Sequence, residues 1–174
     1  LITSCSILFF LYSGFIIYKN RQKNKQSKKE LLADKSAAEF IIMVASEMGS
    51  TFRFAEALSV ALKKAGKSVF VAEMNDFEDY LAAKQIVFLA ATFGDGEPPY
   101  NAYKFEKRLL EISSESRPGY SVVGFGSSYY ENFCGWGVTT NKLLDEHPQY
   151  KETAPFFKID QSSESDFMTW VESW

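Results

Sequence analysis

Residues 40–51 read FIIMVASEMGST, and this stretch decides the fold. Its apolar run, Phe40–Ala45, is typical of a strand buried on both faces of a sheet. The run leads through a loop with three hydroxyl residues around Gly49 into a predicted helix over 52–65, whose apolar side holds Phe54 and Leu58. A buried strand followed by such a loop and an amphipathic helix is typical of a parallel α/β sheet.

The same alternation continues to the end of the chain. Apolar runs predict four further strands, at 67–74, 85–92, 120–125 and 156–160. Helical periodicity predicts helices over 102–112, 136–146 and 163–174, and a short helical turn over 77–81. The sequence therefore predicts one doubly wound α/β domain over residues 38–174, with five parallel strands and interleaved helices.

A different pattern precedes this domain. Residues 1–18 hold no charged side chain and are long enough, as a helix, to cross a bilayer core of about 30 Å. The basic residues follow this run, as at the cytoplasmic end of a membrane span, whereas a signal peptide carries them before it. We expect a transmembrane helix over 1–18, a basic linker over 19–37 and a cytoplasmic domain after it; a signal peptide or a buried core helix is the alternative.

The charges are divided unevenly between these parts. The first 29 residues hold six basic residues and no acidic one, which leaves 13 basic and 22 acidic residues after them and a net charge of −9. An acidic domain repels nucleic acid and favours a basic protein partner. We therefore expect no nucleic acid binding. Cys5 and Cys134 fall in the predicted membrane and cytosolic parts, so we expect free thiols.

Ligands of a parallel sheet bind beyond the carboxyl ends of its strands. The loop after the first strand is Ser46-Glu47-Met48-Gly49-Ser50-Thr51, and its place before a helix predicts an anion site made of backbone N–H groups and hydroxyls. The alternative is an ordinary helix cap. The loop lacks the lysine of a nucleotide triphosphate-binding loop, which disfavours triphosphate hydrolysis.

Two later loops combine glycine with aromatic residues. Residues 91–102, ATFGDGEPPYNA, follow the third strand, and residues 124–134, GFGSSYYENFC, follow the fourth. The glycines let the backbone approach a flat ligand, and Phe93 and Tyr130 could stack on its two faces, with Tyr129 as the alternative to Tyr130. The simpler interpretation of the first of these loops is a Gly-Pro-rich turn.

Together these loops resemble the FMN domain of the diflavin reductases, such as NADPH-cytochrome reductase and the sulfite reductase flavoprotein subunit. The resemblance rests on Ser46–Ser50, on ATFGDGEP from Ala91, on GFGSSYYENF from Gly124 and on the closing DFMTW from Asp166. It implies a flavodoxin-like fold with strand order 2-1-3-4-5 and FMN as the cofactor.

The resemblance also implies roles for single residues. Ser46, Gly49, Ser50 and Thr51 would hold the FMN phosphate, together with the loop residues Glu47 and Met48, although Met48 departs from the usual hydroxyl residue. Phe93, which stands where the family usually has tyrosine, and Tyr130 would stack on the ring, and the carbonyl of Gly94 would face its N5. The remaining expected contacts come from Thr92, Asp95, Gly96, Asn101, Gly126, Ser127, Phe133 and Asp160.

The implied function is single-electron transfer. The resemblance implies an FAD- and NADPH-binding reductase domain, in the same or a separate chain, as the electron donor and a haem or other redox protein as the acceptor. No residue of this sequence is expected to bind NADPH. One alternative is a flavin-free receiver module, but Ser46 and Thr92 stand where it needs acidic residues. A stand-alone quinone reductase is the other.

Overall fold

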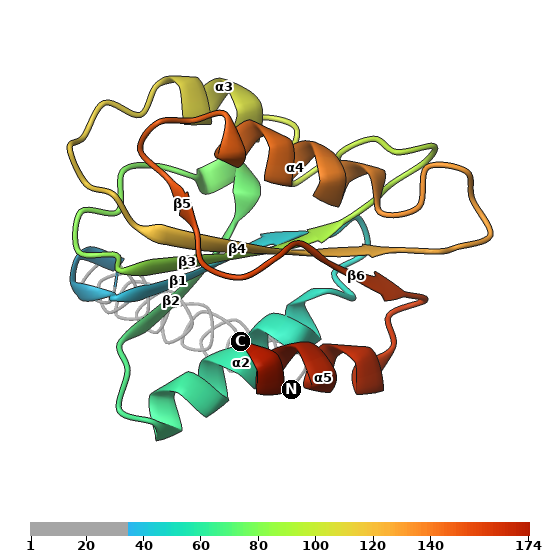
Figure 1. The fold of residues 1–174 in the computed structure, drawn as a ribbon, viewed down its shortest axis with the longest axis horizontal. Helices are drawn as coiled ribbons and strands as arrows, with labels where there is room; N and C mark the ends of the chain where they lie inside the picture. The colour runs from blue at the N-terminus through green and yellow to red at the C-terminus, as the bar shows by residue number, and fades with distance from the viewer. Residues whose placement is uncertain (1–34) are drawn as a thin grey trace, which may run out of the picture.

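The computed structural model describes residues 35–174, which form a parallel sheet between two layers of helices (Figure 1). The strands lie in the order β2-β1-β3-β4, and both β5 and β6 pair with β4. Their bounds are β1 Phe40–Ala45, β2 Val69–Glu73, β3 Gln85–Ala91, β4 Gly119–Gly126, β5 Lys151–Glu152 and β6 Phe157–Asp160. The predicted α/β class and strand order are confirmed.

The strand predicted over 156–160 is confirmed as β6, and a second short strand, β5, precedes it outside the predicted range. β5 pairs with Gly119 and Tyr120 at the start of β4, and β6 pairs with residues 123–126 at its end. Pro155 lies between the two and has no N–H to donate to a ladder, which accounts for the interruption. The sheet therefore has six strands rather than five, with β5 and β6 sharing the fifth position.

Helices cover both faces of the sheet (Figure 1). α2 (Phe52–Lys64) and α5 (Glu164–Ser173) lie on one face, and α3 (Phe105–Leu110) and α4 (Gly135–Asp145) lie on the other. α3 is shorter than the helix predicted over 102–112, because Ala102 and Phe105 hydrogen-bond within tight turns instead. The turn predicted over 77–81 lies earlier, as a 3-10 turn over Met74–Asp76.

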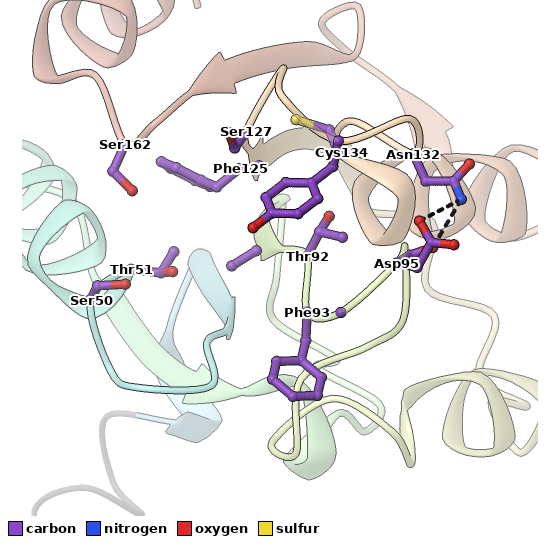
Figure 2. A pocket seen from close by; sticks show the side chains of 14 residues that line it. Ser50, Thr51, Thr92, Phe93, Asp95, Phe125, Ser127, Asn132, Cys134 and Ser162 are labelled. Carbon is purple, nitrogen blue, oxygen red and sulfur yellow. Dashed lines mark hydrogen bonds between the residues drawn. The ribbon is translucent and has the colours of Figure 1, made fainter.

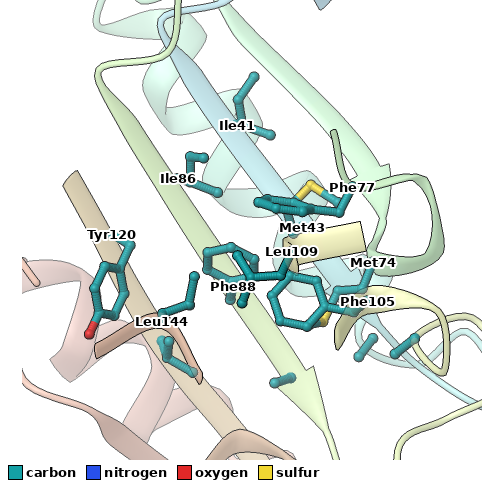
Figure 3. Packing of buried hydrophobic residues seen from close by; sticks show 14 of the residues in the cluster. Ile41, Met43, Met74, Phe77, Ile86, Phe88, Phe105, Leu109, Tyr120 and Leu144 are labelled. Atoms are coloured by element: carbon teal, nitrogen blue, oxygen red, sulfur yellow. The ribbon is translucent and has the colours of Figure 1, made fainter. Parts of the chain in front are cut away.

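Each face of the sheet has its own apolar core. Between the sheet and α3 and α4, the rings of Phe77, Phe88 and Phe105 pack with centroids 5.0 to 5.8 Å apart, and Phe105 meets the other two edge to face (Figure 3). On the other face Phe54 of α2 packs on Phe125 of β4, with ring centroids 4.9 Å apart. This packing fixes the strand ends, and therefore the loops that follow them.

The predicted membrane span over 1–18 and most of the linker over 19–37 lie outside the described residues. The last three residues of the predicted linker, 35–37, are helical. Lys35 among them forms an ion pair with Glu78 at 2.5 Å. Among residues 35–174, no helix has both the length and the apolar character that a membrane span requires.

Candidate functional site

A cavity of about 610 Å³ lies at the carboxyl ends of the central strands (Figure 2). This volume lies within the range typical of cofactor sites. Nine of the residues predicted for the site line it: Ser50, Thr51, Thr92, Phe93, Gly94, Asp95, Gly126, Ser127 and Tyr130. The structure thus brings residues of all three predicted loops to one place.

The first wall is the loop between β1 and α2. The backbone N–H groups of Met48, Gly49 and Ser50 donate to no acceptor within residues 35–174. They precede the first turn of α2, where the helix dipole favours a negative charge. The hydroxyls of Ser50 and Thr51 lie at the same end of the cavity (Figure 2). This set of donors suits a phosphate group.

The second wall is the loop between β3 and α3. Phe93 and Glu97 exchange two backbone hydrogen bonds of 2.9 and 3.0 Å, which closes a tight turn. Gly94 has a φ of 53° in this turn, a left-handed conformation that glycine adopts without strain. The Phe93 side chain remains 50% exposed, so its ring is available for stacking on a planar ligand.

The third wall is the loop between β4 and α4. Tyr130 lines the cavity and is 64% exposed, whereas Tyr129 is 85% exposed and does not line it. The structure therefore favours Tyr130 over Tyr129 as the second aromatic residue.

Three of the predicted residues do not line the cavity but form hydrogen bonds that hold its first loop. Asn101 is buried, accepts a hydrogen bond from the N–H of Ser46 at 2.8 Å and donates to the carbonyl of Val44 at 3.3 Å. Ser46 is also buried, and its hydroxyl accepts a hydrogen bond from the N–H of Thr51. Glu47 accepts a hydrogen bond from the N–H of Tyr100 at 2.7 Å. These residues position the first loop against the second.

Further hydrogen bonds join the other loops. Asn132 donates to the carbonyl and carboxylate of Asp95, at 2.9 and 3.2 Å (Figure 2). Asp160 accepts hydrogen bonds from the hydroxyl and the N–H of Ser128, at 2.6 and 2.8 Å. The hydrogen bonds from Ser128 hold the pKa of the Asp160 carboxyl below its usual value. Asp160 therefore stays ionised and fixes the third loop.

The remaining predicted residues also lie outside the cavity wall. Met48 is 90% exposed, and Gly49 forms the bend of its loop with a φ of 81°. Gly96 and Phe133 line a neighbouring hollow of about 450 Å³, which shares Asp95 and Asn132 with the cavity.

Five lining residues were not predicted: Ala91, Phe125, Asn132, Cys134 and Ser162. Ala91 and Phe125 stand at strand ends, so strand bounds alone could have indicated them. Ser162 belongs to the loop after the last strand, a place where ligand contacts are expected. Cys134 has a φ of 58°, which nothing in the sequence indicates.

Comparison with known proteins agrees with this geometry. The chain is 33% identical over 130 residues to the sulfite reductase (NADPH) flavoprotein alpha-component of Klebsiella pneumoniae, a match that covers 71% of this chain and 22% of that protein. It is 28% identical over 151 residues to the NADPH–cytochrome P450 reductase of Cavia porcellus, covering 79% of this chain and 22% of the reductase. The chain thus spans about a fifth of the length of these relatives.

Solved structures extend the likeness to the fold. Flavodoxin 2 of Bacillus cereus is 26% identical with a TM-score of 0.66, and the match covers 79% of this chain and all of that one. A flavodoxin of Streptococcus pneumoniae TIGR4 is 26% identical with a TM-score of 0.64, covering 74% of this chain and 90% of that one.

The family profile described as Flavodoxin matches residues 42–174, nearly the whole of the described domain. This match carries FMN as the cofactor, and the site offers what FMN requires: loop N–H groups that donate to no acceptor within residues 35–174, for a phosphate, and aromatic side chains for a flat ring. The chain belongs to the flavodoxin family.

Proposed function

We propose that this chain is an FMN-binding electron-transfer domain that receives electrons from an FAD- and NADPH-binding reductase domain and passes them singly to a protein acceptor. The observation that supports it best is the cavity, which Ser50 and Thr51 line at one end and to whose walls Phe93 and Tyr130 contribute. The FMN domains of the reductase relatives add support for the donor.

FMN, when bound, exchanges electrons one at a time, and this is the chemistry that the cofactor supplies. The protein residues bind and tune it. Ser50, Thr51 and the N–H groups of the first loop bind the phosphate. Phe93 and Tyr130 enclose the ring, and the carboxylate of Asp95 disfavours additional negative charge in the cavity. The carbonyl of Gly94 would accept a hydrogen bond from an N–H of the ring.

The first test is the cofactor content of the purified full chain in detergent. We expect a yellow protein that releases about one equivalent of FMN, and no FAD, on denaturation. A colourless protein that does not bind added FMN would instead support the flavin-free module.

The second test separates an electron carrier from a stand-alone reductase. NADPH alone should leave the bound FMN oxidised, whereas NADPH together with the separately purified FAD domain of a diflavin reductase should reduce it. Reduction by NADPH without that domain would contradict the proposal and support a quinone reductase.

We further propose that residues 1–18 anchor the domain to a membrane with the FMN site on the cytoplasmic side. The uncharged run of the sequence and the six basic residues after it support this placement. The full chain should stay in the membrane pellet after an alkaline wash, whereas a variant lacking residues 1–18 should be released. Release of both proteins would contradict the anchor.

A further inference from the structure

Arg53 occupies an unusual position for a basic residue. It is the second residue of α2, next to the loop that the proposed function assigns to the phosphate. A cation in the first turn of a helix opposes the helix dipole, and the first turn of α2 holds no acidic residue to offset it. The residue therefore costs the isolated helix some stability.

The Arg53 side chain is nevertheless fixed in one direction. Its Nη1 donates to Oε1 of Glu164 at 3.0 Å, and its Nη2 donates to the carbonyl of Ser162 at 3.1 Å. The guanidinium carbon lies 4.6 Å from the centre of the Phe54 ring. A guanidinium has five N–H donors, so further donors remain for another acceptor.

This direction brings the guanidinium next to a residue of the cavity wall, although Arg53 itself is not among the lining residues. Ser162, whose carbonyl it contacts, lines the cavity together with Ser50 and Thr51, and Figure 2 shows the three at the same end. Arg53 therefore joins the start of α2 to the loop before α5, beside the end of the cavity that carries the phosphate donors.

The cavity itself has no other charge to offset a phosphate. None of its lining residues, all of them within the described part of the chain, is Lys, Arg or His, and one of them, Asp95, is a carboxylate. Glu47 and Asp160 add negative charge in the adjoining loops. A phosphate dianion placed here has the helix dipole in its favour and Arg53 as the cation beside it.

We propose that Arg53 is a phosphate-binding residue, whose guanidinium stabilises the FMN phosphate while the carbonyl of Ser162 holds it beside the cavity end. The inference rests on the proposed FMN site and adds a charged contact to its neutral donors. Glu164 competes with the phosphate for the same guanidinium. The ion pair between Arg53 and Glu164 therefore weakens the contact between Arg53 and the phosphate.

Riboflavin, which lacks the phosphate, separates this role from a merely structural one. In the full chain stripped of flavin, Arg53→Gln should weaken FMN binding about tenfold, as expected for one charge-assisted hydrogen bond. Riboflavin binding should stay unchanged. Equal weakening of both ligands, or no change for FMN, would overturn the proposal.

Two further variants complete the experiment. Arg117→Gln removes the same charge from an exposed residue just before β4. This residue lies at the amino-terminal end of the strand, whereas the cavity lies at the carboxyl ends, so both affinities should stay unchanged. Glu164→Gln frees the guanidinium, so FMN should bind as tightly as in the wild type or more tightly. If Arg53 served only to tie α2 to α5, Glu164→Gln would weaken FMN binding as Arg53→Gln does, and the proposal would fail. Wild-type protein that binds no FMN would instead reject the proposed function itself.

Discussion

Asn101 joins the first two loops of the cavity through a single buried amide. It satisfies the N–H of Ser46 and the carbonyl of Val44, and both of these residues are buried. Asn101→Ala leaves both buried groups without a partner, so the free energy of unfolding of the flavin-free protein should fall by about 1–3 kcal/mol. Urea denaturation measures this change.

Asn141 offers the matched control for that variant. Its buried Oδ1 has no hydrogen-bond partner among the described residues, so Asn141→Ala removes no hydrogen bond to this oxygen and should change stability by less than about 1 kcal/mol. Equal losses for the two variants would show that the hydrogen bonds of Asn101 contribute nothing specific.

Cys134 makes stability depend on pH above neutrality. Burial raises the pKa of its thiol from 9 to about 11. Between these values the folded protein keeps a proton that the unfolded chain has lost, so the free energy of unfolding falls as pH rises. Cys134→Ser should reduce the fall between pH 8 and 10.5 by about 1–2 kcal/mol, as measured by urea denaturation at each pH. An identical slope in both proteins would contradict this.

At the scale of single residues, sequence reasoning was better at finding the site than at assigning contacts. Ser50, Phe93 and Tyr130 line the cavity as predicted, because each belongs to a loop that directly follows a central strand. Asn101 and Asp160 also lie at the correct loops, but they hydrogen-bond to protein atoms. A loop position can be inferred from strand patterns, whereas the direction of a polar side chain depends on tertiary contacts.

Helix α4 lies against the sheet through two glycines that face each other. A Cβ on Gly137 would approach Cα of Gly124 in β4 to 2.7 Å, and this backbone atom cannot move aside. Replacing a glycine by alanine in the exposed interior of a helix raises the free energy of unfolding by up to about 1 kcal/mol. Gly137→Ala should instead lose about 1–3 kcal/mol of unfolding free energy, because the helix must shift away from β4.

The same helix provides the control on its exposed side. Thr139→Ala replaces an exposed residue two positions on, where helix propensity alone applies, and should leave stability equal or slightly higher. Thermal unfolding of both flavin-free variants compares them. A stabilising Gly137→Ala would show that α4 and β4 do not pack as closely as described.

At the scale of elements, the strands with continuous apolar runs were predictable and the two-residue strand β5 was not. β1 and β3 were predicted to within a residue, because burial on both faces leaves an uninterrupted pattern. The split of the fifth position into β5 and β6 escaped detection, since β5 has only two residues, both exposed. Its pairing with β4 is held by neighbours such as Thr153, which donates its N–H to the carbonyl of Tyr120.

At the scale of the whole molecule, basic and acidic residues are separated along the sequence. Residues 38–174, the domain that carries the cavity, hold 12 basic and 20 acidic residues and a net charge of −8, while six basic residues and no acidic one lie among the first 29. If residues 1–18 lie in a membrane, the basic segment faces the headgroups and the acidic domain faces the cytoplasm. This arrangement favours collision of the FMN site with basic proteins.

The charge of the domain therefore predicts how electron transfer depends on salt. After photoreduction, the full chain should reduce a small basic haem protein with a second-order rate constant that falls at least about tenfold between 10 mM and 500 mM salt, because screening removes long-range attraction. An acidic haem protein of similar size and potential should react slowly at low salt and faster as salt is added. The basic residues before residue 30 would produce the reverse pair of slopes, because they repel a basic acceptor and attract an acidic one. Slopes of the same sign for the two acceptors would mean that the acidic domain does not guide the encounter.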